Sequence, residues 1–160
     1  MTIKVGDKVP DVGFKKMGEN GPEPVAPSDL WPGKTVVLFS VPGAFTPTCS
    51  AKHLPGFVSL SDQLKAKGID TIACTAVNDA FVMGAWGKSQ EANDKVLMLA
   101  DGAGDFIKAC GLELDLMKAG LGVRGQRFVM VVKDGTVTHL AIDPPGTFQD
   151  SSAEAVLATL

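Results

Sequence analysis

The stretch TVVLFSVPGAFTPTCS, residues 35–50, passes from an unbroken apolar run into a turn rich in proline and threonine and ends on cysteine and serine. The run TVVLFSV (35–41) is typical of a central strand, because a strand covered on both faces has apolar residues at consecutive positions. The turn VPGAFTPTCS (41–50) predicts a helix start, with Thr46 as N-cap and Pro47 at the first helical position. Strand end, turn and helix start together form a place where α/β sheets present ligands.

The chain alternates strand and helix patterns outward from this stretch. Residues 48–66 carry apolar residues on one helical face, and Pro55 is expected to kink that helix. Asn78 or Asp79 is expected to cap a second helix, and Ser151 with Glu154 forms a capping box before the last one. The sequence further predicts strands at 69–77 and 95–100, helices at 78–90, 105–114 and 151–160, a loop or edge hairpin at 18–34, and a hairpin at 127–142 around Asp134-Gly135.

The order of these elements is β-α-β-α-β-α, followed by a hairpin and a helix. Parallel units followed by an antiparallel hairpin predict an α/β fold with a mixed central β-sheet flanked by helices on both faces. That is the layout of a thioredoxin-like fold. The length of 160 residues predicts one domain, residues 1–160.

Composition excludes several classes of function. The net charge is −3 and no cluster of Lys or Arg stands out, which argues against a nucleic-acid partner. No apolar run approaches the roughly 18 residues of a membrane span, and the N-terminus MTIKVGDKVPDVGF lacks the apolar core of a signal peptide, so we expect no membrane contact and a cytoplasmic location. The three cysteines include no Cys-x-x-Cys pair and there are two histidines, which argues against a metal site; no cofactor is expected.

Cys49 falls in the first turn of the predicted helix. Backbone N–H groups without helical partners and the positive end of the helix dipole favour a thiolate there. Thr46 stands where the first cysteine of a thioredoxin dithiol would be, so a dithiol cycle within this turn is excluded. A lone thiolate can instead attack the O–O bond of a peroxide while the nearby hydroxyl hydrogen-bonds the substrate. The alternative is an inert buried thiol, for which a Pro-Gly turn is a poor setting.

Three longer motifs surround these residues: PGAFTPTCSAKHLPGF (42–57), AVNDAFVMGAW (76–86) and RGQRFVMVVKDG (124–135). Together they resemble the atypical type-II peroxiredoxins, the peroxiredoxin-five subfamily, over essentially the whole chain. The resemblance implies a thioredoxin-like fold and reduction of hydrogen peroxide and alkyl hydroperoxides. It implies that Cys49 is the peroxidatic cysteine, that Thr46 hydrogen-bonds the peroxide, and that Pro42 shields the site from water.

The resemblance also places the family's active-site arginine at Arg127, at the head of the hairpin. A guanidinium there would stabilise the charge on the departing oxygen. Without the resemblance, Arg127 could equally be an exposed strand-edge residue, and Arg124 is the rival candidate. The residues expected around the substrate are Gly43, Phe45, His53 and Arg124.

His53 follows Cys49 by four residues, a spacing that brings two side chains to one helix face. A Cys–His pair could suggest a protease, but this spacing holds the ring beside the sulfur rather than aimed at it, and an orienting partner is also required. We therefore expect His53 to form a wall of the pocket or to help bind the reductant.

A sulfenic acid on Cys49 must be reduced by a second thiol. The C-terminal region has serines at 151 and 152 and no cysteine, unlike relatives that keep a resolving cysteine there. Cys74 is the possible resolving cysteine, or else a buried core thiol; a bridge would require local unwinding of the helix. A mixed disulfide with glutathione, cleared by glutaredoxin, is the more economical expectation, with thioredoxin as the alternative. Cys110 is expected to be structural or prone to oxidative damage.

Relatives commonly form homodimers through the face that carries the active-site loops, and apolar residues near 81–86 and 116–123 would suit such a surface. Two other functions remain open. The chain could be a non-catalytic thiol redox sensor or partner-binding protein of thioredoxin fold, which would need neither Thr46 nor Arg127. It could also be a thiol–disulfide oxidoreductase, which the missing Cys-x-x-Cys pair argues against.

Overall fold

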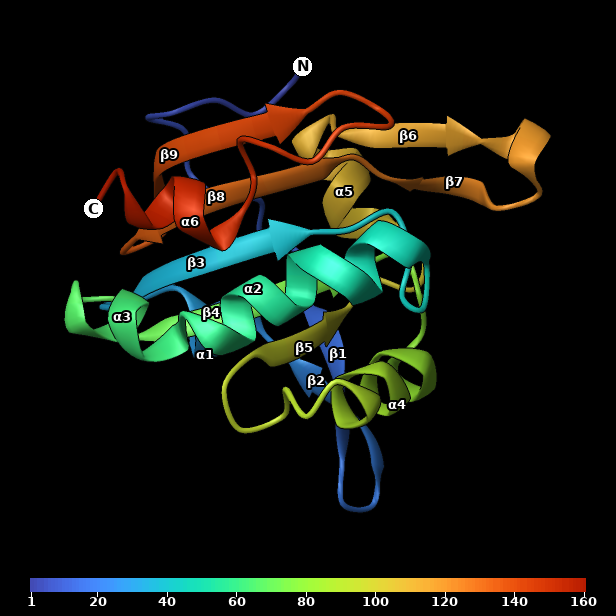
Figure 1. Ribbon diagram of the computed structural model, residues 1–160, viewed down its shortest axis with the longest axis horizontal. Coiled ribbons are helices and arrows are strands. Elements are labelled where there is room, and N and C mark those ends of the chain that lie inside the picture. The colour runs from blue at the N-terminus through green and yellow to red at the C-terminus, as the bar shows by residue number, and fades with distance from the viewer.

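A computed structural model describes residues 1–160 and builds them around one mixed β-sheet (Figure 1). The strands of this sheet are β1 Phe14–Gly18, β2 Gly21–Val25, β3 Thr35–Ser40, β4 Thr71–Ala76, β5 Leu97–Ala100, β8 Arg127–Lys133 and β9 Thr136–Asp143. Their spatial order is β2-β1-β5-β4-β3-β8-β9. β3, β4 and β5 run parallel, whereas β1 and β8 join them antiparallel. The predicted mixed sheet is therefore confirmed.

The remaining elements are α1 Pro27–Leu30, the π-helical turn η1 Cys49–His53, α2 Leu54–Ser59, α3 Ser61–Ala66, α4 Ala80–Ser89, α5 Asp105–Cys110, β6 Glu113–Leu116, the 3-10 turn η2 Met117–Ala119, β7 Gly122–Gly125 and α6 Ala153–Leu157. β6 and β7 form a separate two-stranded hairpin, which projects beside the end of β3 (Figure 1). No helix has the length and apolar character needed to cross a membrane.

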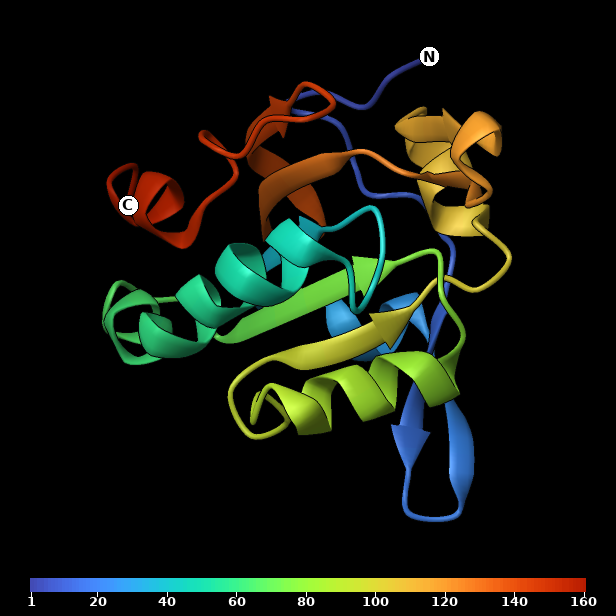
Figure 2. The same cartoon turned by 45° about the vertical axis from the view of Figure 1, so that its right-hand side comes forward.

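Helices cover both faces of the sheet, as predicted. β3 alternates between two cores: Val37 and Phe39 point to one, Val36 and Leu38 to the other. The first core is closed by α2, α3, α4 and α6, and the second by α1 and α5 (Figures 1 and 2). Because β3 is buried on both faces, its apolar residues are continuous rather than alternating.

Two predicted helices are shorter than expected. The helix predicted at 105–114 ends at Cys110, because Gly111 adopts a left-handed conformation (φ 69°) that stops it, and the chain continues as β6. The helix predicted at 48–66 is divided into η1, α2 and α3. Pro55 has no N–H to donate, and in the turn before it the Leu54 N–H bonds back five residues to the Cys49 carbonyl.

The capping predictions were right for one helix and displaced by one residue for another. Asp79 caps α4 by accepting a hydrogen bond from the Val82 N–H. At the last helix, Ser152 rather than Ser151 is the N-cap, and its hydroxyl accepts from the Ala155 N–H. Ser151 is drawn instead to a buried carboxylate on β9, described below.

Candidate functional site

The turn after β3 is held by three hydrogen bonds from different parts of the chain. The Thr46 carbonyl accepts the first helical bond from the Ser50 N–H at 3.0 Å, so Thr46 stands at the helix start as predicted. The Thr46 hydroxyl donates to the Gly43 carbonyl at 2.6 Å. Ala44 N–H donates to Asn78 Oδ1 at 3.0 Å. The Thr46 oxygen keeps its lone pairs available to accept a hydrogen bond from a ligand.

Phe45 lies at the tip of this turn and is 56% exposed. Its φ of 64° puts it in the left-handed region, which a bulky side chain adopts only where its surroundings impose it. The bonds at Gly43 and Ala44 supply that constraint. The turn is therefore a rigid structure that presents Phe45 outward and the start of the helix inward.

The Cys49 thiol lies at the base of the turn and is fully buried. Arg127 Nη2 donates to Cys49 Sγ at 3.1 Å. The backbone N–H groups of Thr48 and Cys49 make no hydrogen bond within the chain, as expected at a helix start. The sulfur thus has a guanidinium on one side and two free donors close by, an arrangement that stabilises negative charge developing on a ligand oxygen.

Arg127 is buried, 9% exposed, and does not lie at an exposed strand edge. Its second nitrogen, Nη1, is 2.8 Å from His53 Nδ1, and its guanidinium lies 5.8 Å from the Phe148 ring centroid. A guanidinium can only donate, so His53 Nδ1 is the acceptor and the ring carries its hydrogen on Nε2. That hydrogen is donated to the Ser151 carbonyl at 2.9 Å.

The His53 ring is held neutral. Burial, and secondarily the positive charge of Arg127, lower the pKa of His53 to about 3. A neutral ring can orient the guanidinium without cancelling its charge. The sequence predicted His53 as a pocket wall or a reductant contact; the structure places it behind Arg127.

Asp143, Asn78 and Phe148 also bear on the site, and the sequence analysis assigned no site role to them. Asp143 is buried and lies directly opposite Arg127 on the neighbouring strand. Burial by itself would raise the pKa of Asp143, but the hydrogen bonds from the Ser151 hydroxyl and from backbone amides of residues 149–151 lower it below its usual value. Asn78 was considered only as a helix cap, although its position directly after β4 was a signal for a role at the sheet edge.

Arg124, the rival candidate, makes no hydrogen bond with Cys49. Its Nη1 donates to the Pro42 carbonyl at 3.1 Å and its Nε donates to the Leu121 carbonyl at 2.8 Å. It also lies against Gly43, where a side-chain Cβ would approach Arg124 Nη1 to 2.8 Å. Arg124 therefore ties the β6–β7 hairpin to the turn that holds Cys49.

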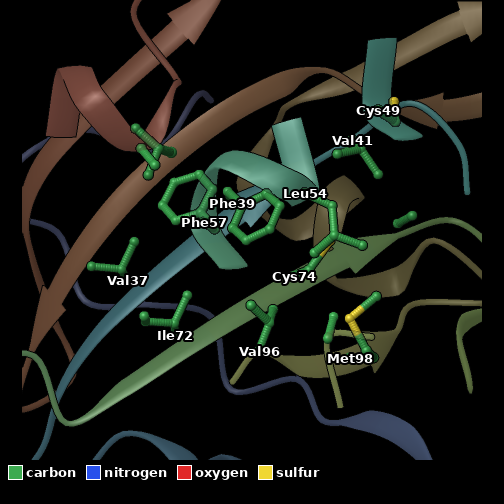
Figure 3. Close-up of a cluster of buried hydrophobic side chains, with 14 of the residues drawn as sticks. Val37, Phe39, Val41, Cys49, Leu54, Phe57, Ile72, Cys74, Val96 and Met98 are labelled. Carbon is green, nitrogen blue, oxygen red and sulfur yellow. The ribbon is translucent and has the colours of Figure 1, made fainter. Parts of the chain in front are cut away.

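The other two cysteines have no such donors. Cys74, on β4, is fully buried in the same core as Cys49, and burial followed by the proximity of Cys49 raises its pKa well above the usual range. Val41 and Leu54 are seen between the two cysteines in Figure 3, and no disulfide joins them. Burial, and then the charge of Asp101, raise the pKa of Cys110 to about 12. Both are thiols at neutral pH.

A cavity of about 180 Å³ opens beside the site. Arg127 and Pro42 form part of its wall, whereas Phe45 and His53 do not line it. Its lining residues are Pro42, Leu114, Leu116, Gln126, Arg127, Asp143, Pro144, Pro145, Gly146 and Thr147. No three His, Cys, Asp or Glu side chains lie close enough together to hold a metal ion.

The chain is similar to known proteins over nearly its whole length. The family model described as Redoxin matches residues 4–157. Peroxiredoxin-2B of Arabidopsis thaliana is 48% identical over 99% of this chain and 98% of its own length. Reduced Prx3 of Vibrio vulnificus in complex with hydrogen peroxide has a TM-score of 0.94 at 49% identity, covering 99% of both chains.

A Burkholderia cenocepacia protein described as a putative thioredoxin reductase has a TM-score of 0.97 at 48% identity, covering 100% of this chain and 99% of that one. This chain has no Cys-x-x-Cys pair that would support dithiol chemistry of its own.

Proposed function

Because the chain belongs to the redoxin family, and within it to the peroxiredoxins, it is a thiol-dependent peroxidase, and we propose that Cys49 is the thiol that attacks the peroxide. The observation that carries this assignment is the 3.1 Å hydrogen bond from Arg127 Nη2 to Cys49 Sγ. Neither Cys74 nor Cys110 accepts a bond from a charged donor, and burial raises the pKa of both.

The reaction is a displacement at oxygen. The Cys49 thiolate attacks one peroxide oxygen, the O–O bond breaks, and the sulfur becomes a sulfenic acid. The other oxygen leaves with the electron pair and takes a proton, giving water from hydrogen peroxide or an alcohol from an alkyl hydroperoxide. Arg127 stabilises the charge as it moves from sulfur to the departing oxygen, and the free N–H groups of Thr48 and Cys49 add donors.

Thr46 and Pro42 complete the catalytic set in this proposal. The Thr46 hydroxyl already donates to Gly43, so it is oriented to accept a hydrogen bond from the peroxide O–H. Pro42 excludes water from the side of the cavity. Gly43 and Arg124 fix the turn from behind, Phe45 forms its exposed rim, and His53 orients the guanidinium.

The chain acts on peroxides with a thiol reductant, and we propose glutathione with glutaredoxin as that reductant, with thioredoxin as the alternative. The C-terminal serines leave no resolving thiol there, and Val41 and Leu54 are seen between Cys74 and Cys49 in Figure 3. Mass spectrometry of peroxide-treated protein with glutathione should show one glutathione on Cys49. A Cys49–Cys74 disulfide would instead support internal resolution.

We also propose a homodimer formed through the active-site face. Phe45, Phe81, Met117 and Val123 are all large apolar residues with more than a third of their surface exposed. Exposed apolar residues of this size on the turn, α4 and the β6–β7 hairpin suit an interface. Analytical ultracentrifugation should give twice the monomer mass, and Phe81→Glu should shift it toward monomer; a monomeric wild type would contradict the proposal.

We propose a cytoplasmic location. Three free cysteines suit a reducing compartment. Cell fractionation tests this proposal.

We also propose that residues 1–160 fold as one domain. The two cores share one sheet, which supports a single cooperative unit. Coincident unfolding transitions by fluorescence and circular dichroism test this proposal.

The decisive experiment replaces the sulfur. Cys49→Ser should abolish turnover of hydrogen peroxide and tert-butyl hydroperoxide in a coupled assay, whereas Cys110→Ser should retain it. If Cys49→Ser turns over like the wild type, the assignment of Cys49 is wrong. If the wild type itself reduces no peroxide but its thiol is oxidised once and stays so, a redox sensor is the better description.

A further inference from the structure

We propose that Asp143 and Ser151 position the guanidinium of Arg127 through the ring of His53, a role that rests on the proposed function of Arg127 and Cys49. The three links are Ser151 to Asp143, His53 to Ser151, and Arg127 to His53. They connect the C-terminal loop to the reactive sulfur although the loop itself contributes no side chain to Cys49.

The first link is the Asp143 carboxylate, which accepts four hydrogen bonds from the loop. Asp143 Oδ2 accepts from Ser151 Oγ at 2.6 Å, Ser151 N at 3.1 Å and Gln149 N at 3.0 Å. Its Oδ1 accepts from Asp150 N at 2.9 Å. Such a set of four bonds fixes the loop at residues 149–151 with respect to β9. Ser151 is fully buried, so its peptide group has no solvent partner to exchange with.

The second link passes from this loop to the imidazole. Because the Ser151 N–H and hydroxyl are both held by Asp143, its carbonyl is oriented toward His53 Nε2 at 2.9 Å. That contact keeps the ring hydrogen on Nε2. The unprotonated Nδ1 then accepts from Arg127 Nη1, which leaves Nη2 directed at Cys49 Sγ.

The placement of Asp143 depends on a β-bulge in the hairpin. Pairing counted from the Asp134-Gly135 turn would set Arg127 opposite Ile142. A register shift between Val131 and Val132 inserts one extra residue on β9 and sets Arg127 opposite Asp143 instead. The bulge therefore places Asp143 directly opposite Arg127.

The loop also prevents Asp143 from neutralising the positive charge of Arg127. Asp143 faces Arg127 across the hairpin but makes no ion pair with it; the ion pair of the chain joins Lys4 to Asp7. With four donors from the loop, the carboxylate is satisfied elsewhere. The guanidinium is oriented by a neutral ring, so its positive charge is not cancelled by a carboxylate partner.

The test compares Asp143→Ala with Asp150→Ala, a matched control that removes the same charge from an exposed side chain in the same loop. The readouts are the rate of sulfenic acid formation with hydrogen peroxide, the rate of Cys49 alkylation by iodoacetamide, and the tautomer of His53 by nitrogen-15 NMR. Asp143→Ala should lower the peroxide rate about tenfold, in the range for loss of an outer hydrogen-bond partner at a reactive site. Asp143→Ala should also convert His53 from one tautomer to a mixture. The peroxide rate of Asp150→Ala should stay within about twofold of wild type.

Ser151→Ala provides a milder variant in case Asp143→Ala does not fold. It removes one of the four bonds, keeps the carboxylate and the carbonyl, and should lower the peroxide rate by about twofold to fivefold, in line with the loss of one hydrogen bond. If a folded Asp143→Ala, or Ser151→Ala in its place, keeps the wild-type rate and tautomer, the positioning role is refuted. Cys49→Ser is measured alongside: should it retain activity, the proposed function fails, whatever the Asp143 variants do.

Discussion

Cys49 and Cys74 have the same burial and different surroundings. Both thiols are fully buried, and both belong to the same core. Cys49 begins a helix and accepts a bond from Arg127, whereas Cys74 sits in the middle of β4 between Phe39 and Met98 of the flanking strands. The two positions therefore differ in the guanidinium and the helix start, which Cys49 has and Cys74 lacks.

This pair of cysteines shows that reactivity here depends on a donor and not on exposure. A thiol that is reactive because it is exposed would be open to any oxidant. A buried thiol with one charged donor reacts only with a molecule small enough to enter and able to use the same donor in the transition state.

The largest effect is expected from Arg127→Gln, which makes the surroundings of Cys49 resemble those of Cys74. Loss of the charged donor should lower the rate of sulfenic acid formation by roughly 100- to 1000-fold, as for other preorganised donors. Stopped-flow measurement with hydrogen peroxide checks this. A loss below tenfold would show that the helix start alone activates the thiol.

His53→Gln tests the neutral ring through the stability of the protein in acid. Since the folded pKa of His53 is about 3 and the unfolded value is about 6.5, the unfolded state binds the extra proton between these pH values. The wild type should therefore lose on the order of 4 kcal/mol of unfolding free energy as pH falls from about 6.5 to 3. His53→Gln should not show this loss. Urea unfolding at a series of pH values measures it.

Asp143 makes the stability of both the wild type and His53→Gln depend on pH at lower pH values as well. Its folded pKa is lowered, so its stabilising contribution is present at neutral pH and disappears below about pH 4, as the carboxylate is protonated. A buried neutral ring would be contradicted if the free energy of unfolding changed with pH equally in wild type and His53→Gln between about pH 6 and about pH 4.5.

A smaller effect is expected from Arg124→Gln, the matched control for Arg127→Gln. It removes the bonds to the Pro42 and Leu121 carbonyls without touching Cys49, and should cost about 1 to 3 kcal/mol of unfolding free energy and a few-fold in rate. Thermal unfolding and the same stopped-flow assay measure both. An effect as large as that of Arg127→Gln would mean that the two arginines act together on the sulfur.

The smallest effect on the first chemical step is expected from Cys74→Ala. Sulfenic acid formation on Cys49 should stay within about twofold of wild type, and stability should fall by about 1 kcal/mol because a buried sulfur is lost. Mass spectrometry after peroxide should detect the same species as in wild type. Accumulation of over-oxidised Cys49 in Cys74→Ala alone would show that Cys74 resolves the sulfenic acid.

Much of the fold was predictable because local patterns and tertiary packing agree. The apolar run 35–41, the Asp134-Gly135 turn and the Thr46-Pro47 helix start each predict an element that the structure contains. The β6–β7 hairpin was missed because its strands are only four residues long and half-exposed, so they carry little periodic signal. The cap at Ser152 was missed because Ser151 finds a stronger acceptor in Asp143.

The residues around the sulfur likewise divide into those that local sequence patterns predict and those that depend on packing. Thr46, Cys49 and the general need for a cationic donor follow from the sequence, since a helix start and its first turn are local structures. The choice of Arg127 over Arg124 was predicted by the resemblance but not by the residue pattern, because both lie near the head of the same hairpin and only packing separates a buried guanidinium from one that ties two loops together.

The strand and helix patterns, the lone thiol at the start of a helix and the hydroxyl beside it were readable from the sequence, because each depends on residues within a few positions of one another. The packing of distant segments sets the hydrogen bond from Arg127 to the sulfur, the position of His53 behind Arg127, and the one-residue bulge that brings Asp143 opposite Arg127. The contacts of Arg127 with Cys49 and with His53 join residues 78 and 74 positions apart, and their geometry depends on strand register and side-chain packing that no local pattern encodes.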